Sequence, residues 1–118
     1  MFAGKYQLGK LIGIVDRNYI QIDGQTEDVM PLDDLGAKWE AFGWHVVEVD
    51  GNSIAGLIGA INTAKAVAQK PSMIIAYTVP GKGVPSMEYD YRWHGKSPTA
   101  EQAREAIELI QSKGRAAK

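Results

Sequence analysis

Oxygen donors that could coordinate a hard cation follow the apolar run Leu11–Val15, which reads as a buried strand. Asn18 offers a side-chain amide oxygen, and Tyr19 and Ile20 offer main-chain carbonyls just beyond it. Such neutral oxygen donors suit Mg²⁺ or Ca²⁺ better than a soft metal, and Mg²⁺ usually shares its shell with phosphates. Asn18 fits equally well as a turn residue that tolerates left-handed backbone. Spacing alone leaves both interpretations open.

A second candidate, His94, lies in the long segment Pro80–Pro98, which is rich in glycine, proline and aromatic residues. A loop of this length and composition is more often a binding element than a linker. Histidine in such a loop can move protons or contact phosphate near neutral pH. The alternative is a surface imidazole beside Trp93. The other histidine, His45, begins a β-branched run and is expected to be structural.

Two glycines, Gly81 and Gly83, follow the last apolar run of the chain. Their backbone amides could approach an anionic ligand in a tight loop. The spacing fits neither a Walker loop nor a dinucleotide-binding fingerprint, so the glycine pair alone is a weak signal.

Composition excludes several classes of function. The 118 residues carry a formal net charge of −1 and no cysteine, so disulfides and thiolate metal sites are ruled out. Basic residues are scattered, which argues against nucleic acid as a partner. No apolar run approaches the roughly 18 residues of a membrane span, so we expect no membrane partner and a cytoplasmic protein.

The elements that must position these residues alternate between strands and helices. Strands are predicted at Leu11–Val15, His45–Val49 and Ser72–Val79, and helices at Asp34–Phe42, Ser53–Gln69 and Thr99–Lys113. This order predicts an α/β fold of three layers, with a mostly parallel sheet and helices on both faces. Three strands make a thin sheet with exposed edges, so we expect a further strand, a partner chain or homo-oligomeric self-association.

Caps and apolar spacing define the helices. Asp33 or Asp34, Ser53, and a capping box of Thr99 with Gln102 mark the three starts. The second helix is expected to bury Ile54, Leu57, Ile58, Ile61, Ala64 and Val67. The third is expected to bury Ala103, Ala106, Ile107 and Ile110.

Four stretches occur in an order and spacing that a known family shares. They are LIGIVDRNYIQIDG, WEAFGWHVVEVDGN, KPSMIIAYTVPGKGV and MEYDYRWHGKSPT. With them the chain resembles the thiamine-diphosphate-binding domain of transketolases, and especially the N-terminal subunit of split transketolases. The resemblance runs from Met1 to about Glu108 and implies a single, partial domain over residues 1–118.

The resemblance implies roles for residues around the cofactor. Ile22 would pack on the thiazolium ring, and Gly81 and Gly83 would line the cofactor pocket. His94 would contact the diphosphate and the donor sugar, which makes it the expected catalytic residue. Pro80 departs from the residue usual at its position.

The same resemblance implies that Asn18 binds Mg²⁺ through its side chain and Ile20 through its carbonyl. The family's Gly-Asp-Gly motif, whose aspartate is the anionic metal ligand, does not occur in this sequence. The glutamate that activates the cofactor belongs to a separate pyrimidine-binding domain. The sequence thus looks like the carboxyl part of the domain, cut inside a helix near Met1, and we expect the isolated chain to be inactive.

The implied function is part of a transketolase, which moves a two-carbon ketol unit between sugar phosphates with thiamine diphosphate and Mg²⁺ in the pentose phosphate pathway. The implied partner is the pyrimidine-binding, C-terminal subunit. One alternative is a related thiamine enzyme, of the deoxyxylulose-phosphate synthase or oxo-acid dehydrogenase type. Another is a non-catalytic α/β binding module.

Overall fold

The computed structural model describes residues 1–116, which form two compact units. The sheet unit comprises Met1–Asn18 and Pro31–Thr78. The loop unit comprises Tyr19–Met30 and the chain from Val79 onward. The expectation of a single domain over residues 1–118 stays a prediction.

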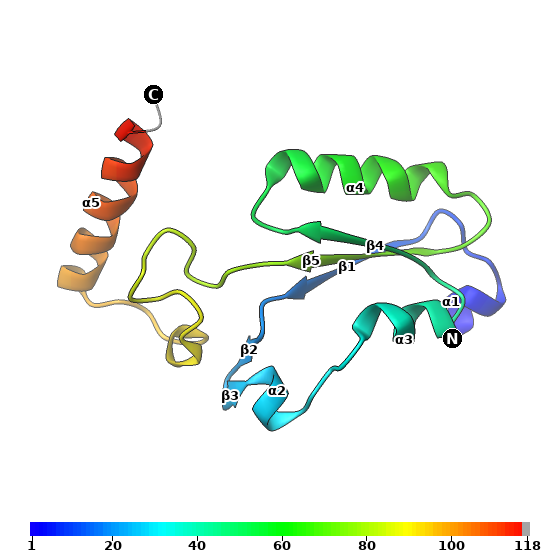
Figure 1. The fold of residues 1–118 in the computed structure, drawn as a ribbon, viewed down its shortest axis with the longest axis horizontal. Coiled ribbons are helices and arrows are strands. Elements are labelled where there is room, and N and C mark those ends of the chain that lie inside the picture. Colours follow the sequence, from blue (N-terminus) through cyan, green and yellow to red (C-terminus); the bar gives the residue numbers. More distant parts are fainter. Residues whose placement is uncertain (117–118) are drawn as a thin grey trace. The chain divides into compact units, whose positions relative to one another are not determined.

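Three parallel strands form the centre of the sheet unit (Figure 1). They are β1 (Ile12–Arg17), β4 (His45–Asp50) and β5 (Ser72–Tyr77), in the order β1-β5-β4. Ser72 of β5 is level with both Ile12 and His45, so all three carboxyl ends lie at the same side of the sheet. The predicted strands are confirmed, with β1 extending two residues further than expected and β5 ending two residues earlier.

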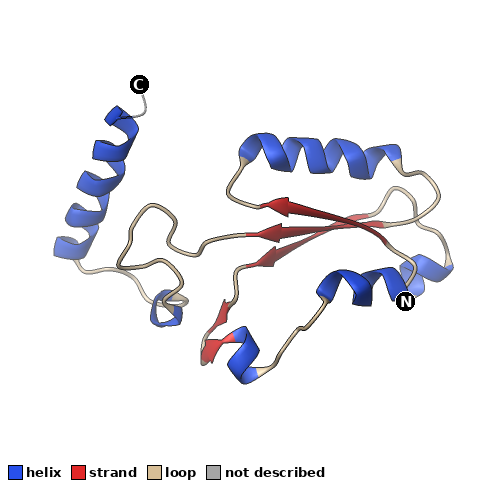
Figure 2. Ribbon diagram, viewed as in Figure 1, coloured by secondary structure: helices blue, strands red, loops and turns tan. Residues whose placement is uncertain are grey.

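Helices cover both faces of this sheet (Figures 1 and 2). On one face α4 (Ile54–Ala66) packs Ala60 and Ala64 against Ile74. On the other face α1 (Phe2–Lys5) and α3 (Leu35–Ala41) pack around Trp44, Met73 and Ile75. The three-layer α/β architecture with a parallel sheet is therefore confirmed.

The cap residues are confirmed, and the start of α3 is now defined. The Asp34 carboxylate accepts a hydrogen bond from Ala37 N at 2.8 Å, and Ser53 Oγ accepts one from Gly56 N at 3.1 Å. Between the two candidates for the first cap, Asp34 is the capping residue.

Two predicted helix faces were partly wrong. On α4, Ile54 and Ile58 are 78% and 57% exposed, because the small residues Ala60 and Ala64 form the contact with the sheet. On the last helix, Ile107 and Ile110 are 53% and 52% exposed, because that helix is buried mainly through Ala106. Apolar spacing identified the helices, but it did not identify which apolar stripe is covered.

The β1 edge of the sheet carries an exposed apolar side chain. β1 pairs only with β5 within residues 1–116. Ile14, in the middle of β1, is 57% exposed. An apolar edge strand of this kind is a template for further pairing, so self-association or pairing with a partner strand is still expected.

The loop unit contains short elements joined by long connections. They are β2 (Ile20–Gln21), β3 (Gly24–Gln25), α2 (Thr26–Val29), the 3₁₀ helix η1 (Tyr91–Trp93) and α5 (Ala100–Ala116). β2 and β3 form an antiparallel hairpin that the sequence did not predict. The capping box of α5 is confirmed, since Gln102 N donates to Thr99 Oγ1 and Thr99 N donates to Gln102 Oε1.

Across residues 1–116, the structure has no helix with both the length and the apolar character needed to cross a membrane.

Candidate functional site

A tight loop follows β5 and carries the predicted glycine pair. Gly81 and Gly83 have φ angles of +74° and +98°, in the region that favours glycine. A Cβ on Gly81 would lie 2.7 Å from backbone atoms of Met87, too close for any side chain. Gly83 N donates to the Glu88 carboxylate at 2.9 Å, which fastens the loop. The two glycines are therefore required by the backbone itself.

Beyond this loop, η1 ends directly before the predicted histidine, His94. Asp90 is its N-cap, and its carboxylate accepts a hydrogen bond from the backbone N–H of Arg92 at 3.0 Å. His94 N then donates to Tyr91 O at 2.9 Å, so His94 directly continues the helical turn. The His94 side chain is exposed, as expected for a loop imidazole.

Within the loop unit, Ile20, Gly81 and His94 line one pocket of about 200 Å³, together with Trp93 and Lys96. Its wall combines apolar surface with a basic side chain and an imidazole. The Ile20 side chain is 5% exposed, whereas the other predicted residue of that hairpin, Ile22, is 74% exposed and does not line the pocket.

Gly83 and Asn18 do not join this group. A Cβ on Gly83 would point toward Ile110 of α5, at 3.7 Å. Asn18 is the last residue of the sheet unit, while Ile20 belongs to the loop unit. Their pairing as metal ligands stays a prediction. Within residues 1–116, no three acidic or histidine side chains are grouped so that they could hold a metal ion.

Charges beside the pocket are partly neutralised by an ion pair. Arg92 Nη2 lies 2.7 Å from Asp90 Oδ2. The hydrogen bonds from the Arg92 side chain hold the pKa of Asp90 below its usual value, and the same contacts raise the pKa of Arg92. Lys96 Nζ lies 5.4 Å from the centre of the Trp93 ring, a cation–π contact. Lys96 lines this pocket, whereas Arg92 does not.

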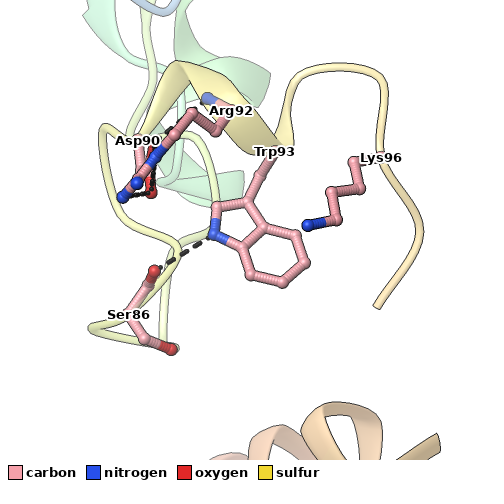
Figure 3. A pocket seen from close by; sticks show the side chains of 5 residues that line it. All are labelled: Ser86, Asp90, Arg92, Trp93 and Lys96. Atoms are coloured by element: carbon pink, nitrogen blue, oxygen red, sulfur yellow. Dashed lines mark hydrogen bonds and ion pairs between the residues drawn. The ribbon is translucent and has the colours of Figure 1, made fainter. Parts of the chain in front are cut away.

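A second pocket, of about 240 Å³, adjoins the same segment (Figure 3). Figure 3 shows Ser86, Asp90, Arg92, Trp93 and Lys96 around it, with the Trp93 indole N–H donating to Ser86 O at 3.2 Å. Asp90, Trp93 and Lys96 line both pockets. The segment of residues 90–96 therefore forms the wall between them.

Sequence reasoning missed Asp90, Trp93 and Lys96 as members of the site. The alternation of acidic, aromatic and basic residues in YDYRWHGK was the available signal. This pattern shows which of the side chains lie together only once η1 is known, because the helical turn decides which side chains share a face.

Comparison with known proteins identifies the family. The family model described as the thiamine diphosphate binding domain of transketolase matches residues 1–112. An apulose-4-phosphate transketolase subunit of Phocaeicola vulgatus is 40% identical over 110 residues, which cover 93% of this chain and 39% of that protein. The 6-deoxy-6-sulfo-D-fructose transketolase subunit SqwG of a Clostridium species is also 40% identical, over 97% of this chain and 42% of that protein.

Solved structures agree with this relationship. A transketolase from Pichia stipitis, in complex with sedoheptulose 7-phosphate, superposes with a TM-score of 0.69 at 28% identity, over 98% of this chain and 20% of the other. The chain spans about two fifths of the length of the two transketolase subunits that it matches. With a family model that matches residues 1–112 and a shared fold, this chain belongs to the transketolase family and matches part of its thiamine diphosphate-binding domain.

Proposed function

We propose that this chain supplies the diphosphate-binding part of a transketolase, which transfers a two-carbon ketol unit between sugar phosphates. The observation that supports this proposal is the pocket of the loop unit, which is lined by Ile20, Gly81, His94 and Lys96. The family model matches the part of the chain that contains these residues. We further propose a cytoplasmic enzyme of pentose phosphate metabolism, with the partial domain spanning residues 1–118.

The residues of the pocket fit part of thiamine diphosphate. Lys96 and His94 offer donors suited to an anionic diphosphate, and Gly81 lets the backbone approach a ligand closely. Ile20 and Trp93 provide apolar cover. Pockets for ligands of this size usually have about 300–1,000 Å³, so about 200 Å³ suits a portion of the cofactor rather than all of it. Ile22 and Gly83 are proposed to contact the remainder.

The proposed metal is Mg²⁺, held by the Asn18 side chain and the Ile20 carbonyl. What supports this pair is its sequence motif and the neutral oxygen chemistry that Mg²⁺ accepts. The nearby carboxylate of Asp16 already accepts a hydrogen bond from Thr78. Two neutral donors carry no charge to offset the ion, so the fit is to Mg²⁺ bound together with a diphosphate, not to the free ion.

When bound, thiamine diphosphate supplies the carbanion chemistry of ketol transfer. The chain's own residues bind and orient. The Lys96 ammonium balances negative charge, and the His94 imidazole donates a hydrogen bond to an anionic oxygen or a donor hydroxyl. Ile20 and Trp93 exclude water from the same pocket, which strengthens those polar contacts.

Partners and substrates follow from the relatives. Two relatives are named as transketolase subunits, and we propose that this chain likewise works with a pyrimidine-binding, C-terminal subunit. Their names specify a phosphorylated and a sulfonated ketose. We therefore propose a ketose with an anionic terminus as the donor, with sugar phosphates as the main class.

The first test is reconstitution. The purified 118-residue chain, given excess Mg²⁺ and thiamine diphosphate, is expected to perform no ketol transfer, because it lacks the activating glutamate of the pyrimidine-binding domain. Adding a complementing transketolase that lacks this segment is expected to restore turnover of a ketose-phosphate donor. Turnover by the chain alone would contradict the assignment, as would failure of every complementing partner.

The second test separates function from folding at His94. His94→Ala is expected to change the unfolding free energy by no more than about 0.5 kcal/mol, since the imidazole is exposed. In the complemented enzyme it should cost on the order of 2–4 kcal/mol of transition-state stabilisation, measured from kcat/KM for the donor. A fall in the denaturant midpoint with unchanged kcat/KM would make His94 a structural residue.

A further inference from the structure

The half-buried carboxylate of Asp90 makes an unusually complete set of contacts. Its Oδ1 accepts hydrogen bonds from Arg92 N at 3.0 Å and Arg92 Nε at 2.8 Å. Its Oδ2 accepts from Arg92 Nε at 3.1 Å and Nη2 at 2.7 Å. One side chain thus caps η1 and grips the guanidinium group within that helix (Figure 3).

The helix that Asp90 caps contains the pocket residue Trp93 and is followed directly by the pocket residue His94. Trp93 N donates to Asp90 O at 3.1 Å, and His94 N donates to Tyr91 O at 2.9 Å. η1 has only three residues. So short a helix is not stable alone, because nucleating a turn fixes several dihedral angles for one hydrogen bond. The direction of Trp93 and His94 therefore depends on contacts that brace the turn from outside.

Those external contacts surround Asp90. Tyr89, the residue before it, has a φ of +58°, which is uncommon for a residue with a side chain and costs free energy. Tyr89 O accepts from Gln25 Nε2 at 2.9 Å, and Tyr89 N donates to Pro80 O at 3.2 Å. Hydrogen bonds thus hold the backbone at Tyr89, and the Asp90 carboxylate connects this fixed point to η1 through its contacts with Arg92.

Asp90 also lines the pocket that holds His94, where a carboxylate is electrostatically unfavourable for an anionic ligand. Both oxygens of the Asp90 carboxylate face Arg92, and the positive charge of Arg92 offsets the negative charge of the carboxylate. A carboxylate so engaged is poorly placed to take up a proton or bind a ligand.

We infer that Asp90 is a positioning residue, whose carboxylate holds η1 so that Trp93 and His94 face the pocket. The inference rests on the proposed function only for the identity of the ligand that the pocket receives. The contacts between Asp90 and η1 are a property of the unliganded chain.

The experiment uses NMR on the 118-residue chain, following the Trp93 indole N–H and the His94 ring signals. In Asp90→Ala both sets of signals should move, and the Trp93 indole N–H should exchange with solvent about tenfold faster, because the turn opens locally. Asp90→Asn should give a smaller change, since its amide oxygen still accepts from Arg92 N. Arg92→Ala should also give a smaller change, because the cap survives.

Asp33→Ala is the matched control, because it removes an exposed carboxylate that pairs with Lys38 at 3.5 Å in the sheet unit. It should leave Trp93 and His94 unchanged. Unchanged signals in Asp90→Ala would overturn the inference, as would an effect of Arg92→Ala equal to that of Asp90→Ala. If Asp90→Ala disorders the whole loop unit, Asp90→Asn takes its place in the test. Unchanged Trp93 and His94 signals in Asp90→Asn would then overturn the inference.

Titration with thiamine diphosphate and Mg²⁺ separates this inference from the proposed function. If both hold, the ligand shifts the His94 signals in the wild-type chain and shifts them less in Asp90→Ala. Equal shifts in both proteins would overturn the positioning role alone. If the ligand shifts no His94 signal in the wild type while Asp90→Ala still moves the Trp93 and His94 signals, the result counts against the proposed ligand. The positioning role of Asp90 then stands.

Discussion

The two units of this chain are ordered by different forces. In the sheet unit Ile74 and Ile75 are completely buried, and two apolar clusters sandwich the strands. In the loop unit order comes largely from hydrogen bonds and one ion pair around Glu88, Asp90 and Trp93. The residues of the candidate pocket belong to this second kind of structure. The sheet is thus ordered mainly by apolar burial, whereas the pocket residues depend mainly on polar contacts.

The largest expected effect tests whether the sheet unit dominates stability. Ile75→Ala should lower the unfolding free energy by about 2–5 kcal/mol, because it leaves a cavity at a completely buried position. Ile110→Ala is the matched control, because Ile110 is 52% exposed on α5, and it should cost no more than about 0.5 kcal/mol. Denaturant unfolding of both variants measures the difference. Equal losses would mean that the two units depend on their apolar residues alike.

The same contrast explains what the sequence could predict. The three strands and the caps Asp34, Ser53 and Thr99 depend on residues close in the chain, and they were found. The hairpin β2–β3 and the helix η1 were missed because they are too short to carry a periodic pattern. They are joined instead by contacts between distant residues, such as Gln25 Nε2 to Tyr89 O, 64 positions apart.

The site was predicted to a similar extent. Ile20, Gly81 and His94 were named from a motif and share one pocket, although their roles stay proposals. Lys96 was not named, because its place beside Trp93 depends on how η1 turns. The exposure of Ile107 on α5 could not be predicted either, since periodicity does not say what will cover a helix.

The next effect concerns the glycine loop. Gly81→Ala should cost about 1–3 kcal/mol, because φ is +74° and the new Cβ would lie 2.7 Å from Met87 backbone atoms. Gly95→Ala is the control, since nothing lies within 4 Å of its added Cβ, and its cost should stay within about 0.5 kcal/mol. Hydrogen exchange should locate the loosening in the loop unit. An equally large loss for Gly95→Ala would contradict the assigned constraint.

A smaller effect on stability, with a clear effect on assembly, is expected at the sheet edge. The wild-type chain should self-associate through β1, and Ile14→Lys should raise the monomer fraction in a light-scattering concentration series, because charge on an edge strand opposes pairing. Ile54→Lys is the control, since Ile54 is 78% exposed on a helix. Dissociation by the control alone would move the contact from the edge to α4. A monomeric wild type would remove the expectation.

The smallest effect is a dependence on acid that originates at Asp90. The hydrogen bonds from Arg92 hold the pKa of Asp90 below its ordinary value of 3.8 in the folded chain. The folded state therefore binds this proton less readily than the unfolded state, so the contribution to stability is present above the unfolded pKa and is lost as the pH falls through the folded pKa.

Arg92, the partner of Asp90, has a raised pKa and stays charged over the whole acid range. Because the Arg92 side chain is exposed, salt should weaken the effect. Subtracting the acid unfolding curve of Asp90→Asn from that of the wild type isolates this one group from the other carboxylates. The difference should shrink below the ordinary pKa of aspartate and be smaller at high ionic strength. If the two curves coincide, the cap, which asparagine keeps, and not the charge, is what Asp90 contributes.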